Sequence, residues 1–271
     1  MGWPVEHSRS PLLHGFWLKE HGIDGEYVLL PVRPDELPAA LRGLAARGFA
    51  GCNLTIPHKQ AALAIVDEID ASAARIGAIN TVVVRPDGAL DGRNTDAFGF
   101  RENLRAAQPG WRAAAGPAVV LGAGGAARAV VAALLDDGAP EIRLVNRSRD
   151  RAAVLAAALG GAIEVVDWAR RADVLAGAGL LVNTTSLGMT GQPSLELPLD
   201  ALPKTSLVND IVYAPLETPL LSAARRRGNP VVDGLGMLLH QARPAFAAGF
   251  GVMPEVTPAL REVMVASLVK R

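Results

Sequence analysis

Short runs of β-forming residues alternate along the chain with segments of helical periodicity. These runs lie at 26–32, 50–54, 80–84, 118–121, 141–145, 163–166, 179–183 and 206–210. Strands that alternate with helices in this way are typical of parallel sheets whose faces are covered by helices. The pattern therefore predicts an α/β protein.

Two segments of the first half refine this prediction. A helix capped near Asp35 should bury one apolar face, formed by Leu37, Ala40, Leu41 and Leu44. Between 80 and 92, the turn residues Pro86-Asp87-Gly88 join two short β runs, which indicates a hairpin. The first sheet should therefore be mostly parallel with one antiparallel strand.

A glycine-rich segment follows the strand at 118–121. Gly122-Ala123-Gly124-Gly125-Ala126-Ala127 matches the pattern G-x-G-x-x-A and opens a helix that should end near Gly138. In a dinucleotide site, Gly122 allows a tight turn, Gly124 lets the backbone approach a pyrophosphate, and Ala127 lets the helix pack on the strand. Free amides at the helix N-terminus then bind the phosphates. The alternative is a plain strand-to-helix turn that uses glycine for positive φ.

Basic residues follow the next strand, where an NAD enzyme would offer Asp or Glu to the ribose hydroxyls. The segment contains Asn146, Arg147, Ser148 and Arg151. A planar guanidinium suits bidentate contact with a 2′-phosphate, so these residues indicate NADP. The alternative is a solvated, arginine-rich helix start, although positive charge there opposes the helix dipole.

Composition and charge limit the classes of partner. The 271 residues are 50% hydrophobic, enough for two moderate cores, and 27 basic residues balance 27 acidic ones. The chain has no net positive charge that would attract nucleic acid or an anionic membrane, so we expect a small-molecule partner. A single cysteine, Cys52, and an N-terminus without the blocks of a signal peptide favour the cytoplasm. The scattered histidines have no cysteine at zinc spacing, and no metal site is expected.

Polar residues gather at predicted strand ends, where open α/β sheets place ligands. They fall in the segments 7–11, 53–59, 80–81 and 94–96. Ser10 precedes Pro11, so it is either a helix cap or a ligand contact. Pro57 should begin a helix, which would put Lys59 in a first turn, where the dipole disfavours a protonated ammonium and favours proton exchange. Asp96 could hold this amine. Taken singly, Lys59 is better explained as an exposed lysine at a helix start, and Asp96 as a carboxylate that complements a helix dipole. Taken together, the two residues favour a catalytic pair.

Several of these segments resemble the signatures of the shikimate dehydrogenase family. Residues 2–11 resemble its G-x-P-x-x-H-S-x-S-P motif, and residues 51–59 resemble G-x-N-V-T-x-P-x-K, with Leu54 in place of the usual valine. Residues 76–82 and 92–96 are similar to the next two motifs in order. The nucleotide loop, residues 146–148, 210–213 and 233–241 also fit, so the resemblance covers nearly the whole chain.

The resemblance implies an NADP-dependent oxidoreductase that interconverts 3-dehydroshikimate and shikimate by hydride transfer, in aromatic amino-acid and chorismate biosynthesis. Lys59 and Asp96 would form the catalytic pair. The substrate carboxylate and hydroxyls would be held by Ser8, Ser10, Thr55, Asn80, Tyr213 and Gln241. NADP would contact Gly122, Ala123, Gly124, Gly125, Ala126, Asn146, Arg147, Ser148, Arg151, Thr185, Ile211, Gly234 and Met237.

The implied architecture has two domains. Residues 1–96 with 232–271 would form the substrate domain, and 97–231 a Rossmann-type NADP domain, with hydride transfer in a cleft between them. We expect a monomer or homodimer. Family members usually carry a strand just before the first motif, which here begins at Gly2, so we expect the first sheet to lack that strand.

Three alternatives stay open. A relative acting on quinate or aminoshikimate differs by only a few hydrogen bonds to substrate. An enzyme of the methylenetetrahydrofolate dehydrogenase type shares the layout and a lysine, although the serine pair favours a small polyhydroxylated acid. A non-catalytic NADP-binding regulator would have lost Lys59 or Asp96, and both are present.

Overall fold

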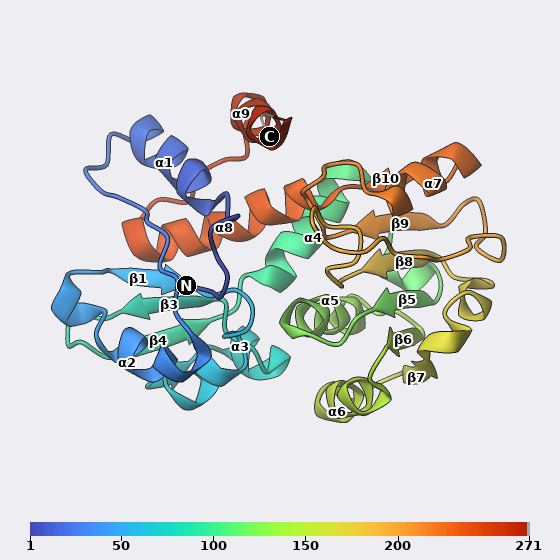
Figure 1. Ribbon diagram of the computed structural model, residues 1–271, viewed down its shortest axis with the longest axis horizontal. Helices are drawn as coiled ribbons and strands as arrows, with labels where there is room; N and C mark the ends of the chain where they lie inside the picture. Colours follow the sequence, from blue (N-terminus) through green and yellow to red (C-terminus); the bar gives the residue numbers. More distant parts are fainter. Residues whose placement is uncertain (270–271) are drawn as a thin grey trace. The chain divides into compact units, whose positions relative to one another are not determined.

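The computed structural model describes residues 1–269 and divides into two compact units (Figure 1). The first unit comprises Met1–Asp96 and Leu239–Arg271, and the second comprises Ala97–Leu238. Each unit contains a β-sheet and packed helices, which confirms the predicted α/β class.

The first unit contains a four-stranded sheet of order β1-β3-β4-β2. Its strands are β1 (Gly51–Asn53), β2 (Glu68–Ile69), β3 (Thr81–Val84) and β4 (Leu90–Arg93). β3 runs antiparallel to both β1 and β4, whereas β2 runs parallel to β4. Three strands thus share one direction, and the predicted hairpin supplies the single reversed strand.

The segment 26–32 differs from its prediction. It contains no regular strand, only an isolated parallel bridge between Gly2 and Pro31. Among the described residues it makes one backbone–backbone hydrogen bond, from Val32 N to the Gly2 carbonyl at 3.1 Å. A strand exists only where a neighbour pairs along its length, and β propensity alone cannot supply that neighbour.

Helices of the first unit pack around this sheet. They are α1 (Ser10–Glu20), α2 (Leu37–Arg42), α3 (Ala71–Ile76) and α9 (Pro258–Val269), with 3₁₀ turns at Pro34–Glu36, Ala45–Arg47 and Ala61–Ala64. The predicted apolar face is correct, since Leu37, Leu41 and Leu44 are at most 1% exposed. The cap predicted near Asp35 falls on the next residue, because the cap position of α2 is Glu36, which makes no side-chain capping bond. The 3₁₀ turn comes first and has its own cap at Arg33, whose backbone N–H donates to the Glu36 carboxylate at 3.1 Å.

The second unit contains a six-stranded parallel sheet of order β10-β9-β8-β5-β6-β7. Its strands are β5 (Ala118–Leu121), β6 (Ile142–Asn146), β7 (Ile163–Asp167), β8 (Leu180–Asn183), β9 (Leu207–Asp210) and β10 (Val231–Val232). The strand order reverses between β5 and β8, and Leu121 pairs with Asn183 at that point. In open α/β sheets, ligands bind beyond the carboxyl ends of the strands at such a reversal.

Helices cover both faces of this sheet (Figure 1). The helices of this unit are α5 (Gly125–Asp136), α6 (Arg149–Leu159) and α7 (Pro219–Arg227), together with α4 (Asp96–Ala107) from Ala97 on and the first turn of α8 (Gly234–Phe250), which belongs to the first unit from Leu239 on. α5 and α6 lie on one face. The other face buries Val119 and Leu121 with Leu175 and, from α7, Leu220 and Leu221. α5 ends as predicted, with Gly138 just past the cap at φ +82°. None of the helices within residues 1–269 is long and apolar enough to cross a membrane.

Candidate active site

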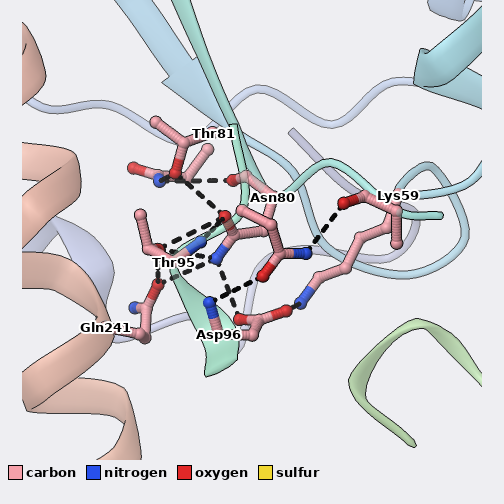
Figure 2. A network of polar contacts seen from close by, with 9 residues as sticks. Lys59, Asn80, Thr81, Thr95, Asp96 and Gln241 are labelled. Atoms are coloured by element: carbon pink, nitrogen blue, oxygen red, sulfur yellow. Dashed lines mark hydrogen bonds and ion pairs between the residues drawn. The ribbon is translucent and has the colours of Figure 1, made fainter. Parts of the chain in front are cut away.

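Lys59 and Asp96 lie at the centre of a polar network in the first unit (Figure 2). Lys59 Nζ donates to Asp96 Oδ2 at 2.5 Å, and the two side chains are only 15% and 6% exposed. A pair this far from bulk solvent is weakly screened, and removing one partner would leave the other charge uncompensated. The structure therefore brings together the two residues that the sequence singled out for proton transfer.

The local structure around Lys59 differs from its prediction. Pro57 does not begin a helix: residues 56–60 form turns, and the first helical segment is the 3₁₀ helix Ala61–Ala64. His58 N donates to the Thr55 carbonyl at 2.9 Å, which closes a tight turn in place of a helical one. The helix-dipole argument for Lys59 is therefore wrong.

Long-range contacts hold the turn that carries Lys59. Ile79 N donates to the Lys59 carbonyl at 2.7 Å. The neighbouring His58 is 1% exposed, and its Nε2 lies 2.8 Å from the Val32 carbonyl. Burial lowers the pKa of His58, so its ring stays neutral near pH 7 and serves to anchor this turn.

Asn80 links the residues around Asp96. Its side-chain Nδ2 donates to Asp96 Oδ1 and to Thr95 Oγ1, both at 2.9 Å, and lies 3.3 Å from Gln241 Oε1 of α8 (Figure 2). Its Oδ1 accepts from Thr95 N at 2.8 Å. With one carboxylate oxygen bound to Asn80, Asp96 presents its other oxygen to Lys59.

Ser8 and Ser10 form a second polar group, at the start of α1. Ser8 Oγ lies 3.2 Å from Ser10 Oγ and accepts from Ser10 N at 3.3 Å. The alternative that Ser10 caps the helix is wrong, because α1 begins at Ser10 itself and its cap position, Arg9, makes no side-chain capping bond. Two adjacent hydroxyls can both donate to an anionic oxygen group.

Tyr27 and Asn53 connect the serines to the rest of the network. Tyr27 Oη donates to Asn53 Oδ1 at 2.8 Å and also contacts the Ser10 hydroxyl. Asn53 Nδ2 donates to Thr81 Oγ1 at 2.9 Å. Burial raises the pKa of Tyr27, so its hydroxyl remains a donor. Sequence reasoning missed Tyr27, and the signal was available: a tyrosine in an apolar run must find a partner for its hydroxyl when buried.

Two of the predicted substrate residues lie outside these contacts. Thr55 is exposed, and its backbone N donates to the Met1 carbonyl at 2.9 Å. Tyr213 belongs to the second unit and follows β9. Of the six predicted substrate residues, Tyr213 is the one that the second unit supplies.

The glycine loop lies at the carboxyl end of β5. Gly122 has φ +113°, and Thr184 Oγ1 lies 2.5 Å from the position of a Cβ, so only glycine fits there. Gly124 caps α5 with an ordinary φ of −91°, and nothing lies within 4 Å of the position of its Cβ. A plain turn requires glycine at position 122 but not at position 124, where φ is ordinary. Open space at a helix N-terminus fits a pyrophosphate, as NADP would require.

The basic segment follows β6. Asn146 Nδ2 donates to the Ser148 carbonyl at 2.8 Å, and Ser148 caps α6 by accepting from Arg151 N at 3.4 Å. Arg149 pairs with Asp167 at 2.9 Å. Arg147 precedes the helix and is exposed, and within residues 1–269 neither Arg147 nor Arg151 makes an ion pair. Both guanidiniums are therefore available to an anion such as the 2′-phosphate of NADP.

The remaining predicted cofactor contacts follow β8 and β9 or begin α8. Thr185 Oγ1 donates to Asn183 Oδ1 at 2.7 Å, and Ile211 N donates to the Asn183 carbonyl at 3.1 Å. Gly234 abuts the Ile211 carbonyl with no room for a Cβ, and Met237 is 6% exposed. These residues therefore share one end of the sheet with the glycine loop.

Known proteins resemble the chain over nearly its whole length. Family models described as "Shikimate dehydrogenase substrate binding domain" and "Shikimate / quinate 5-dehydrogenase" match residues 1–82 and 107–189. A shikimate dehydrogenase (NADP(+)) of Paramagnetospirillum magneticum is 65% identical over 96% of this chain and 95% of that protein. The chain belongs to the shikimate dehydrogenase family.

Solved structures agree with this assignment. A shikimate 5-dehydrogenase from Thermus thermophilus, in complex with NADP(H) and shikimate, is 39% identical, with a TM-score of 0.85 over 99% of this chain and 97% of that one. A quinate dehydrogenase from Corynebacterium glutamicum, in complex with NAD, is 33% identical, with a TM-score of 0.89 over 98% and 96%. The predicted shikimate dehydrogenase family and its NADP-dependent enzyme class are therefore confirmed.

Two further observations concern the lone cysteine and the metal-ligating side chains of this shikimate dehydrogenase family member. Burial raises the pKa of the Cys52 thiol, in β1, to about 11, so it is not a nucleophile near neutral pH. Among residues 1–269, no group of three or more His, Cys, Asp or Glu side chains could hold a metal ion.

Proposed function

We propose that this protein reduces 3-dehydroshikimate to shikimate reversibly with NADPH, and that Lys59 and Asp96 are its catalytic pair. The observation that carries the proposal is the buried contact of 2.5 Å between the Lys59 ammonium and the Asp96 carboxylate. It supplies an acid at a fixed position beside a set of hydroxyl and amide groups.

When bound, NADPH supplies the hydride. Hydride addition to the ketone carbon builds negative charge on the carbonyl oxygen, and Lys59 stabilises it by donating a proton from Nζ. One C–H bond and one O–H bond would form, while the carbonyl π bond, the C–H bond of the hydride donor and an N–H bond of Lys59 would break. This would leave NADP⁺ and a neutral Lys59 amine that regains its proton from solvent. In the reverse direction the amine takes the proton from the alcohol.

Asp96 and Asn80 keep the acid in place. Asp96 holds the protonated form of Lys59 through Oδ2, and Asn80 fixes the carboxylate through Oδ1 at 2.9 Å. Because Asn80 is 2% exposed and also bonded to Thr95, the carboxylate has little freedom to rotate.

The substrate would be held by its carboxylate and hydroxyls. Ser8 and Ser10 offer two adjacent hydroxyls to the carboxylate, with Tyr27 supporting Ser10. The ring hydroxyls would bind Thr55, Asn80, Tyr213 and Gln241. This arrangement suits a small polyhydroxylated acid. We further propose residues 1–96 with 232–271 as the substrate domain and 97–231 as the NADP domain.

NADP would be held by the second unit. The pyrophosphate fits the open space at Gly124, and the 2′-phosphate fits Arg147 with Asn146, Ser148 and Arg151 around it. The nicotinamide half would contact Thr185, Ile211, Gly234 and Met237.

A spectrophotometric assay tests the proposal. The purified protein should reduce NADP when given shikimate, with kcat/KM at least tenfold above that with quinate or aminoshikimate, and NAD should be the poorer cofactor. A preference for quinate would reassign the substrate, because a solved relative is a quinate dehydrogenase. Binding of NADPH without oxidation on addition of 3-dehydroshikimate would support the regulator alternative.

We also propose that the enzyme acts in the cytoplasm as a monomer or homodimer and without nucleic acid. The balanced charge and the single cysteine support this setting.

A further inference from the structure

Asp210 is a buried carboxylate that the proposed mechanism does not use. It lies at the carboxyl end of β9, is 0% exposed, and makes no ion pair with any residue in the range 1–269. Its Oδ1 accepts from Asn183 Nδ2 at 3.0 Å and from Val212 N at 3.1 Å, and its Oδ2 accepts from Thr218 Oγ1 at 2.7 Å. An unpaired buried carboxylate is costly, so its retention calls for a reason.

Asn183 carries the effect of Asp210 to the neighbouring loop. It ends β8, pairs in register with Asp210 and is also 0% exposed. Since its Nδ2 faces the carboxylate, its Oδ1 must face the other way, where it accepts from Thr185 N at 3.0 Å and Thr185 Oγ1 at 2.7 Å. Nδ2 also donates to the Leu187 carbonyl at 3.1 Å. The loop after β8 is thus folded around one oriented amide.

The same carboxylate shapes the loop after β9. Val212 N donates to it directly, and Thr218, whose hydroxyl also donates to it, caps α7. The residues Thr185 and Ile211, proposed to contact the nicotinamide half of NADP, lie on these two loops. One buried group therefore contacts the loop after β9 directly and the loop after β8 through Asn183.

We propose that Asp210 is a positioning residue that, through Asn183, holds the loops after β8 and β9 in the form that binds NADP. The inference rests on the proposed function for the identity of the cofactor. Its test measures only the affinity for NADP⁺ and does not depend on turnover.

The charge of Asp210 is needed for this role, because all three groups around it are donors. The groups that face it are neutral: the Asn183 amide, the Val212 N–H and the Thr218 hydroxyl. Burial raises the pKa of Asp210 to about 6, against the effect of the three donors. Below that pH the added proton would face a group that now donates to the carboxylate, so at least one of the three donors would lose the oxygen that accepts from it. NADP should therefore bind less tightly in acid.

The test is a calorimetric titration of NADP⁺ into wild type and Asp210→Asn between pH 5 and 7.5. The amide keeps the volume but turns an N–H toward one donor. We expect its Kd to exceed that of wild type about tenfold at pH 7.5, and the ratio of the two Kd values to approach one at pH 5. The ratio cancels the titration of the 2′-phosphate, whose own pKa is about 6. Asp200 is exposed, so the Asp200→Asn variant is the matched control, and its Kd should equal that of wild type at every pH.

A ratio of one for Asp210→Asn at pH 7.5 would overturn the inference, as would a tenfold ratio that persists at pH 5. If this variant does not fold, Thr218→Val decides. It removes one donor and keeps the carboxylate, so NADP⁺ affinity should begin to fall at a higher pH than in wild type, and an unchanged profile would overturn the inference. Activity of wild type on shikimate is a separate measurement. If it is absent while the binding results hold, the proposed function fails and the inference on Asp210 stands.

Discussion

Lys59 and Asp96 meet at 2.5 Å although 37 positions separate them in the sequence. The lysine comes from a turn held by the Ile79 N–H, and the aspartate from the first residue of α4, held by Asn80 and Asn94. Backbone and amide contacts within one unit therefore set the geometry of the proposed proton donor. A positioned acid loses little entropy in the transition state, which is how such a group accelerates a reaction.

The first prediction concerns this acid. Lys59→Ala should lower kcat by roughly 10²–10⁴, the usual effect of a lost general acid, and leave the Kd of NADPH within twofold of wild type. Steady-state assays and a fluorescence titration measure the two quantities. The exposed Lys19→Ala, in the same unit, is the control. Turnover equal to wild type would remove Lys59 from the mechanism.

The second prediction concerns the 2′-phosphate. Arg147→Ala should weaken NADPH binding at least tenfold and change NADH binding little, because the exposed guanidinium is free to pair with the phosphate that NADH lacks. Arg149→Ala is a matched control, since that side chain is already paired with Asp167 at 2.9 Å. Equal losses of affinity for NADPH and NADH would show that Arg147 does not bind the 2′-phosphate.

The third prediction separates two glycines of the same loop. At Gly124 the backbone has an ordinary φ and open space, so Gly124→Ala should retain the Tm of wild type and lose NADPH affinity, because its methyl group occupies the room needed by the pyrophosphate. Gly122→Ala should lower both the Tm and the affinity for NADPH, since φ is +113° and the methyl group would clash with Thr184. Thermal denaturation and cofactor titration give the two readouts. Unchanged affinity in Gly124→Ala would argue for a plain turn.

The fourth prediction concerns stability in acid. Burial lowers the pKa of His14 to about 3, and its ring stacks on Tyr27 at 4.1 Å. In the unfolded chain His14 takes up a proton near pH 6.5, whereas in the folded protein it does not. The contribution of neutral His14 to the free energy of unfolding is therefore complete above pH 6.5 and is lost as the pH falls toward 3. The loss is at most about 5 kcal/mol, from the size of the pKa change.

His14→Phe should remove this dependence. Its free energy of unfolding should change less than that of wild type between pH 6.5 and 4, as measured by urea denaturation. The exposed His21→Phe serves as the control and should follow wild type. Parallel curves for wild type and His14→Phe would show that His14 is not the group responsible.

Local patterns were enough to predict much of the fold. The hairpin of β3 and β4 follows from turn residues between two β runs, and the glycine loop follows from its place between β5 and α5. The central strands β5, β8 and β9 of the second sheet are buried along their whole length, so their apolar runs stand out from the helical segments. In each case the signal lies within a few residues of the element that it predicts.

The failures depend on distant partners. Segment 26–32 has β propensity but pairs only at Pro31, and Pro57 fixes one φ without supplying the residues that continue a helix. The same reason hides the roles of Tyr27 and Asp210, because each depends on hydrogen-bond partners that only the folded chain brings near. Single residues at site positions could be named from the sequence, whereas the hydrogen bonds that orient them could not.

The weakly acidic thiol of Cys52 has a practical consequence. With a pKa of about 11, it reacts slowly with maleimides at neutral pH, where attack requires the thiolate. A cysteine introduced at an exposed position in each unit could therefore carry a fluorophore or spin label without removal of the native one. Distances measured between such labels, with and without ligands, would report directly on domain motion in solution.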